Sequence, residues 1–207
     1  MTDIRVIDDA DGVRIADWLE RRLRQALEAS DGRVAVTVPG GSTPFPIIAE
    51  LVTRPLDFAR LDVWPNDDRI VPEDHEASNS GKLRALLEPV GAQVIALNED
   101  SAPPRFALAW LGMGPDGHIA SLFPNTDPDP ADPLPVRRLT PDPLPPHAPF
   151  DRITLTIPSL LASDAVLFTL GGAEDKRAVF DEALRGEHDL PVARLLANAQ
   201  QQVTCFT

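Results

Sequence analysis

The chain has 207 residues, 43% of them hydrophobic, a formal net charge of −13 and a single cysteine, Cys205. This length suits one α/β domain with an ordinary apolar core. The acidic balance argues against non-specific binding to nucleic acid or to an anionic membrane surface. One cysteine excludes an internal disulfide and a cysteine-rich metal site. No apolar run is long enough to cross a membrane and no basic-then-apolar leader opens the chain, so we expect a cytoplasmic protein.

Strands and helices are predicted to alternate along most of the chain, which is typical of an α/β domain with a parallel sheet. The predicted strands are residues 5–7, 34–38, 61–64, 94–97, 106–111, 152–157, 165–170 and 203–206. The predicted helices are residues 11–30, 44–52, 81–87, 119–123, 175–184 and a last one from Pro191. Only a short polar link joins the strands at 94–97 and 106–111, which is too short for a full crossover helix.

A glycine-rich turn with a histidine follows the apolar run 106–111. Gly112, Gly114 and Gly117 allow a sharp turn and a close approach to a ligand. Asp116 and His118 lie in this turn, at the carboxyl end of a buried strand, where open parallel sheets bind their ligands. Because imidazole titrates near neutral pH, we interpret His118 as a general base.

A second glycine turn follows the strand at 34–38. Gly40-Gly41-Ser42-Thr43 precede Pro44, and Thr43 is suited to cap the helix that begins there. Free amides at the start of a helix favour an anion, so this turn predicts phosphate binding, although a plain tight turn would look similar. It is no Walker A loop, because no Gly-Lys-Ser/Thr follows.

Charged residues near other predicted strands are weaker candidates. Asp67-Asp68-Arg69 follow the strand at 61–64, where a carboxylate could orient an imidazole or sugar hydroxyls and an arginine could hold an anion. Arg152 begins a strand. Lys176 lies in the first turn of a helix, where a cation opposes the helix dipole and so hints at a ligand.

Two other functions for the histidine turn are disfavoured by its surroundings. Gly112, Gly114 and Gly117 spell the dinucleotide fingerprint, but Pro115 stiffens the turn and no acidic residue ends a strand about twenty residues on. A metal site at Asp116 and His118 lacks a further ligand with recognisable spacing.

These motifs together resemble the glucosamine-6-phosphate isomerase/6-phosphogluconolactonase family. The Gly112–Pro124 string, Gly-Met-Gly-Pro-Asp-Gly-His-Ile-Ala-Ser-Leu-Phe-Pro, is very specific, and its last five residues favour the lactonases over the deaminases. The other matching segments are residues 40–44, 67–72, 78–79, 152–156 and 171–176. They occur in the family's order and cover most of the chain.

The resemblance implies a three-layer α/β sandwich with a mainly parallel central sheet, formed by residues 1–207 as one domain with a proline-rich surface excursion at 124–149. It also implies hydrolysis of 6-phosphoglucono-δ-lactone in the oxidative pentose phosphate pathway, without metal or organic cofactor, by a monomer or weak homodimer.

The family's roles map onto matching positions of this chain. His118 would be the base that activates water. The catalytic site would be lined by Asp67, Arg69 and Asp116. The phosphate would be held by Gly40, Gly41, Ser42, Thr43, Arg152 and Lys176. Ser121 is expected only to cap or pack.

Three features depart from the family pattern. Asp68 stands where glutamate is usual, the helix expected before Phe106 is reduced, and the chain stops at Thr207 without the usual longer tail. Two alternatives stay open: a deaminase or isomerase acting on an amino-sugar phosphate, and a non-catalytic sugar-phosphate sensor. The second is disfavoured because no helix-turn-helix segment or basic face precedes the domain.

Overall fold

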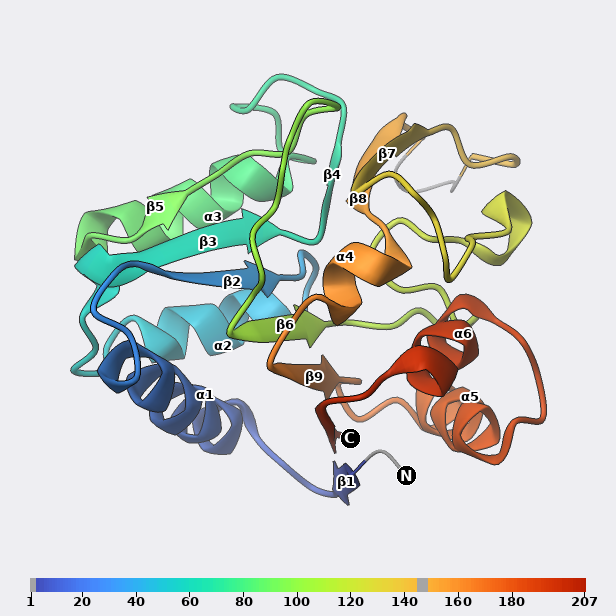
Figure 1. Cartoon of the computed structure of the whole chain (residues 1–207), viewed down its shortest axis with the longest axis horizontal. Helices are drawn as coiled ribbons and strands as arrows, with labels where there is room; N and C mark the ends of the chain where they lie inside the picture. Colours follow the sequence, from blue (N-terminus) through green and yellow to red (C-terminus); the bar gives the residue numbers. More distant parts are fainter. Residues whose placement is uncertain (1–2, 145–148) are drawn as a thin grey trace.

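A seven-stranded sheet in which every pairing is parallel forms the centre of the protein in the computed structural model, which describes residues 3–144 and 149–207 (Figure 1). The strand order is β1-β10-β9-β6-β2-β3-β5. In this order the strands are Ile4–Ile7, Gln202–Phe206, Ala165–Thr169, Leu108–Leu111, Val34–Val38, Leu61–Pro65 and Gln93–Val94. The predicted mainly parallel α/β fold is confirmed.

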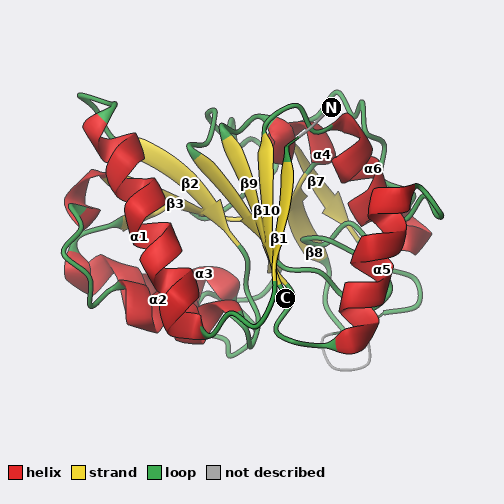
Figure 2. Cartoon of the chain, turned by 90° about the horizontal axis from the view of Figure 1, so that it is seen from below, coloured by secondary structure: helices red, strands yellow, loops and turns green. Residues whose placement is uncertain are grey.

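Helices cover both faces of this sheet, so the fold has three layers (Figure 2). One face carries α1 (Gly12–Glu28), α2 (Pro44–Leu51) and α3 (Asn79–Leu87). The other face carries α4 (Ile157–Leu161), α5 (Glu174–Arg185) and α6 (Pro191–Asn198). Short 3₁₀ turns are η1 (Phe58–Arg60), η2 (Glu88–Val90) and η3 (Pro124–Thr126).

Central strands are apolar throughout because both of their faces are buried. In β6, Ala109 and Leu111 point into the core beneath α5 and α6, while Leu108 and Trp110 point into the core beneath α1 and α2. All four are at most 2% exposed. The continuous apolar run in the sequence therefore reflects two alternating sets of core residues on one strand.

A small antiparallel sheet lies beside the main one, in the order β4-β8-β7. Its strands are β4 (Asp67–Arg69), β8 (Arg152–Leu155) and β7 (Val136–Leu139). Only β8 was predicted. In the register Asp67 lies opposite Thr154 and Arg69 opposite Arg152, so this sheet brings the acidic motif against the arginine strand.

Several predicted local features are wrong. Residues 119–123 form no helix: Ile119 and Leu122 make an antiparallel bridge, and Ala120 has φ +50°. Thr43 makes no side-chain cap, because its own backbone is helical (φ −77°, ψ −48°). The predicted strand at 152–157 ends at Leu155 and continues into α4. The absence of a crossover helix between β5 and β6 is confirmed for these described residues.

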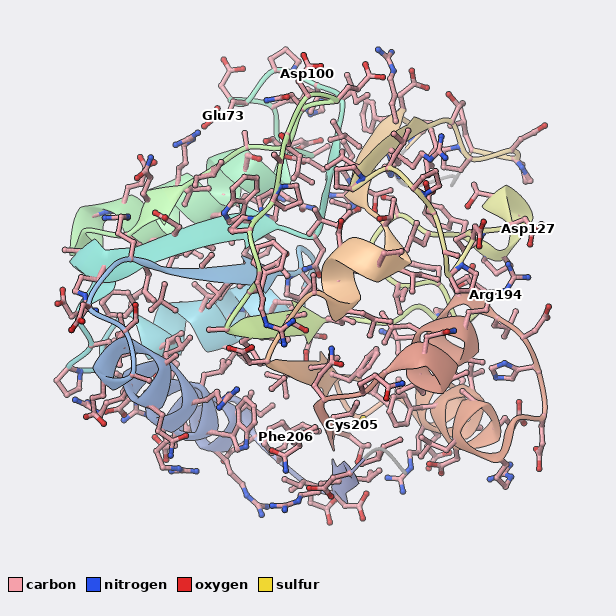
Figure 3. The ribbon with its side chains drawn as sticks, in the orientation of Figure 1. Glu73, Asp100, Asp127, Arg194, Cys205 and Phe206 are labelled. Carbon is pink, nitrogen blue, oxygen red and sulfur yellow. The ribbon has the colours of Figure 1, made fainter. Side chains whose placement is uncertain are left out.

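The proline-rich segment 124–149 is tied to the rest of the protein. Its strand β7 pairs with β8, so part of this segment is sheet, not loop. Arg194 of α6 donates from Nη1 to Asp127 Oδ1 at 2.6 Å, and these two side chains lie together at the right of Figure 3. Residues 145–148 of the segment lie outside the described residues.

Phe168→Ala should destabilise the fold strongly. The Phe168 side chain is fully buried on β9 and packs edge-on against Phe180 of α5, with ring centroids 5.2 Å apart. Truncation leaves a cavity between the sheet and α5, which typically costs about 3–5 kcal/mol. Urea unfolding followed by circular dichroism measures the loss. Val13→Ala, at a half-exposed helix position, is the control and should change the unfolding free energy by less than about 0.5 kcal/mol.

Candidate active site

The candidate site lies where four neighbouring strands end. Strands β9, β6, β2 and β3 are adjacent and parallel, so the segments that follow them meet at one edge of the sheet. The chain leaves β2 toward β3 on one side and leaves β6 toward β9 on the other. This reversal of strand order between β2 and β6 is the place where open α/β sheets form a binding crevice.

A pocket occupies this edge and gathers candidates from all four segments. Its lining contains Pro39, Gly40, Gly41, Ser42, Thr43, Pro44, Asp67, Gly112, Met113, His118, Ala120, Thr169 and Lys176. Seven of the ten predicted site residues are therefore brought together here. Asp116 contacts the pocket through His118, whereas Arg69 and Arg152 are not among the lining residues.

His118 and Asp116 form a hydrogen-bonded pair. His118 Nδ1 lies 2.6 Å from Asp116 Oδ1, and the imidazole packs on Phe123 with centroids 4.7 Å apart. The hydrogen bond from His118 holds the pKa of Asp116 below its usual range, so the carboxylate is the acceptor and Nδ1 carries the proton. In the neutral imidazole the unprotonated nitrogen is then Nε2, which no described residue engages and which is able to act as a base.

The glycine turn fits closely around this imidazole. A Cβ on Gly114 would lie 2.2 Å from His118 Nδ1 and Cε1, so only glycine leaves room for the ring. Gly114 N donates to the His118 carbonyl oxygen at 2.9 Å, which closes the turn. Val192 N, at the start of α6, donates to the Gly117 carbonyl oxygen at 3.1 Å, so α6 supports the turn from behind.

The half of the pocket that suits an anion is formed by the loops after β2 and β9. Gly41 adopts φ +111°, which lets the loop turn into the start of α2. Lys176 reaches the same pocket from the first turn of α5. The loop that leads into α2, two hydroxyls and one ammonium group therefore surround a single space that suits a phosphate group, while Pro44 and Pro46 offer no N–H at the start of α2 itself.

Asp67 lies in the pocket wall between these two halves. It is 9% exposed, and Ser121 donates from Oγ to its Oδ2 at 2.5 Å. Burial raises the pKa of the Asp67 carboxyl, while the Ser121 hydrogen bond and, more weakly, the Arg69 charge oppose that rise. Ser121 was not predicted to contact a site residue, because its position depends on the positive φ of Ala120.

The two arginines lie outside the lining of this pocket, and Arg69 lines a second hollow together with Asp68 and Ser78. Arg69 donates from Nη1 to the Ala77 carbonyl oxygen (3.0 Å) and to Asn79 Oδ1 (3.1 Å), which ties β4 to the start of α3. Arg152 is 2% exposed and donates from Nη1 to the Phe150 carbonyl oxygen at 2.7 Å. Burial, and secondly the facing Arg69 charge, lowers the pKa of the Arg152 guanidinium.

Asp68 has a structural role that its short side chain performs well. Its carboxylate accepts from the backbone N–H groups of Asn79 (2.6 Å) and Ser80 (2.8 Å), which are free amides at the start of α3. The Asn79 side chain then donates from Nδ2 to the Asp67 carbonyl oxygen at 3.0 Å. A Cβ on Gly40 would lie 2.0 Å from Asn79 Oδ1, so Asn79 also supports the loop after β2.

The described residues form neither a metal-binding cluster nor a membrane-spanning helix. No group of three or more His, Cys, Asp or Glu side chains is arranged to hold a metal ion within residues 3–144 and 149–207. Among the helices of the same ranges, none is long and apolar enough to cross a bilayer.

The chain is similar to known proteins over nearly its whole length. The family model described as glucosamine-6-phosphate isomerases/6-phosphogluconolactonase matches residues 9–103 and 92–205. A 6-phosphogluconolactonase of Pseudomonas aeruginosa is 36% identical over 84% of this chain and 82% of its own. The crystal structure of a 6-phosphogluconolactonase from Shewanella baltica matches with a TM-score of 0.81 and 25% identity, over 100% of this chain and 97% of that one.

A monomeric glucosamine-6-phosphate deaminase shares the fold with a TM-score of 0.77 at 16% identity, over 98% of this chain and 97% of its own. The fold is thus common to proteins named as lactonases and as deaminases. The family of this chain therefore follows from its similarity in sequence. The chain belongs to the family of glucosamine-6-phosphate isomerases and 6-phosphogluconolactonases.

Proposed function

We propose that this protein hydrolyses 6-phosphoglucono-δ-lactone to 6-phosphogluconate, as an enzyme of the oxidative pentose phosphate pathway. The observation that carries the proposal is the His118–Asp116 pair at the wall of a pocket whose opposite side is built for an anion. The relatives named 6-phosphogluconolactonase support the choice of substrate. This reaction needs a base and a phosphate-binding group, and the positions of His118 and of Ser42, Thr43 and Lys176 in one pocket support the proposal.

The reaction is direct attack by water. His118 Nε2 takes a proton from water as the water oxygen bonds to C1 of the lactone. The C1 carbonyl oxygen becomes an oxyanion, which collapses as the bond from C1 to the ring oxygen breaks. His118 returns its proton to that ring oxygen, and the new carboxylic acid ionises. General acid–base assistance of this kind contributes roughly 10²–10⁴-fold.

Asp116 orients the base throughout this cycle. Its carboxylate accepts from Nδ1, which fixes the tautomer and stabilises the imidazolium that forms when Nε2 takes the proton. The phosphate group lies against Ser42, Thr43 and Lys176, and its distance from the reacting bond lets binding energy fix which carbonyl faces His118. Arg69, whose Nη1 is already engaged by Ala77 and Asn79, maintains the wall that carries Asp67.

His118→Ala should lower kcat by about 10²-fold or more, because the base that deprotonates water is removed. The assay uses freshly generated 6-phosphoglucono-δ-lactone with spontaneous opening subtracted. His75→Ala, at a histidine in an exposed loop, is the matched control and should keep full activity. Wild-type protein that is no faster than the blank would overturn the proposed substrate. Equal activity in wild type and His118→Ala would overturn the mechanism.

Release of ammonia from glucosamine 6-phosphate tests the alternative activity of the family. The proposal predicts none above the blank. Ammonia release without lactone hydrolysis would reassign the protein to the deaminases, and binding of 6-phosphogluconate without turnover of either substrate would reassign it as a sugar-phosphate sensor.

Lys176→Ala should raise KM about tenfold or more with little change in kcat, because a hydrogen bond to a charged group is lost far from the reacting carbonyl. Steady-state kinetics on the lactone separates the two constants. The chain's other lysine provides the control: Lys82 Nζ lies 5.7 Å from the Phe45 ring centroid, outside the pocket lining, and Lys82→Ala should leave KM unchanged. A fall in kcat at constant KM would show that Lys176 assists the chemistry.

Gly114→Ala should reduce kcat by roughly tenfold or more while the protein stays folded. The added methyl group takes the space of the imidazole, and a misplaced base loses much of its effect. Gly12→Ala introduces the same methyl group where the nearest atom is Ile47 Cγ1 at 3.7 Å, and it should be as active as the wild type. Lactone hydrolysis and thermal unfolding of both variants give the comparison, and an unimpaired Gly114→Ala would contradict the tight fit.

A further inference from the structure

Ser121 makes a buried hydrogen bond that the mechanism above does not use. The side chain is 1% exposed, and its Oγ donates to Asp67 Oδ2 at 2.5 Å, across 54 positions of sequence. The bond joins the segment after β6, which carries His118, to β4, which carries Asp67. These two segments carry Asp67 and His118, and the other ionisable side chain in the pocket lining, Lys176, comes from α5.

The backbone around Ser121 is shaped to make this contact. Ala120 adopts φ +50°, a conformation that residues with a Cβ rarely take and that needs support from its surroundings. The support is present: the Ser121 N–H donates to Thr154 Oγ1 at 3.2 Å, and Ile119 and Leu122 close the turn with a bridge. The strained turn directs the Ser121 hydroxyl toward β4. A helix over residues 119–123 would have pointed this hydroxyl in another direction.

Asp67 is held firmly from its other side as well. Asn79 Nδ2 donates to its carbonyl oxygen at 3.0 Å, and its strand pairs with β8 opposite Thr154. With Oδ2 engaged by Ser121, the remaining oxygen, Oδ1, has no hydrogen-bond partner among the described residues, and Asp67 is part of the pocket lining. One carboxylate oxygen is thus available in the pocket that contains His118.

We propose that Ser121 is a positioning residue: it holds the Asp67 carboxylate so that Oδ1 accepts a hydrogen bond from a hydroxyl group of the lactone ring. The inference rests on the proposed function and adds a specificity contact to it. A ring hydroxyl donating to Oδ1 orients the lactone so that C1 faces His118 Nε2. A lactone without that hydroxyl would lose the contact.

The charges around Asp67 make the Ser121 bond important for this role. Arg69 on the same strand and Arg152 on β8 favour the carboxylate, whereas burial and the neighbouring Asp68 disfavour it; His118 and Lys176 line the same pocket. The Ser121 hydroxyl is the largest of the influences that lower the pKa of Asp67. Without it, Asp67 takes up a proton at higher pH, and the protonated group is a poorer acceptor.

The test is a double-mutant cycle on lactone hydrolysis with wild type, Ser121→Ala, Asp67→Asn and the double variant. We expect each single change to lower kcat/KM by about 10- to 100-fold, mainly through KM, and the double variant to be no worse than Asp67→Asn alone. In Ser121→Ala the acidic limb of the pH profile of kcat/KM should move to higher pH. Ser163→Ala is the matched control, since Ser163 is fully buried at the opposite end of the sheet, where its Oγ donates to the Leu160 carbonyl oxygen.

Ser121→Cys keeps the shape of the side chain with a larger atom at its end and is a weak donor. It provides the test if Ser121→Ala does not fold, and its kcat/KM should lie between those of wild type and Ser121→Ala. Wild-type kcat/KM and pH profile in a folded Ser121→Ala or Ser121→Cys would overturn the inference while leaving the proposed function intact. Additive losses in the double variant would overturn it equally. Wild-type protein that does not hydrolyse the lactone would overturn the proposed function and this inference together.

Discussion

The parallel arrangement of β9, β6, β2 and β3 is the constraint on which the site depends. Because all four strands run in one direction, the loops that follow them are brought to one edge, although they lie far apart in sequence. The loops then support one another: Asn79 fills the space beside Gly40, and Val192 supports the turn at Gly117. The topology of the sheet thus forms the pocket. Because its loops contact one another, a substitution in one loop affects the position of the next.

A pocket for an anion needs local positive charge, whereas the molecule as a whole is negatively charged. A net charge of −13 repels a phosphorylated substrate at long range, so attraction has to come from groups within a few ångströms, where screening is weakest. Under the proposed function, Lys176 and the loop that leads into α2 supply it. Each of the two carboxylates near this half is held by one hydrogen bond: Asp116 by His118, and Asp67, through Oδ2, by Ser121.

Much of this arrangement could be predicted from sequence because its signals are local. Apolar runs mark the buried strands, and glycine turns after them mark Gly40–Thr43 and the His118 turn. The three-stranded sheet was missed at β4 and β7, because short polar strands depend on distant partners that no local pattern reveals. The helix expected at 119–123 failed for a similar reason: bonds from Ser121 to Asp67 and Thr154, both distant in sequence, outweigh a local preference. Arg152 matched a motif, but its burial outside the pocket lining depends on the pairing of β8 with β4.

The position of β10 has a consequence for how the chain is assembled. β10 lies between β1 and β9, and β1 has no other strand partner among the described residues. Gln202 donates to Asp3 across a separation of 199 residues, so nearly the whole chain must be made before the first strand can pair. Contacts of such long range are costly in loop entropy and form slowly. During synthesis, therefore, β1 is unpaired and β9 is an edge strand until β10 has been made. β10 then pairs with both strands at once.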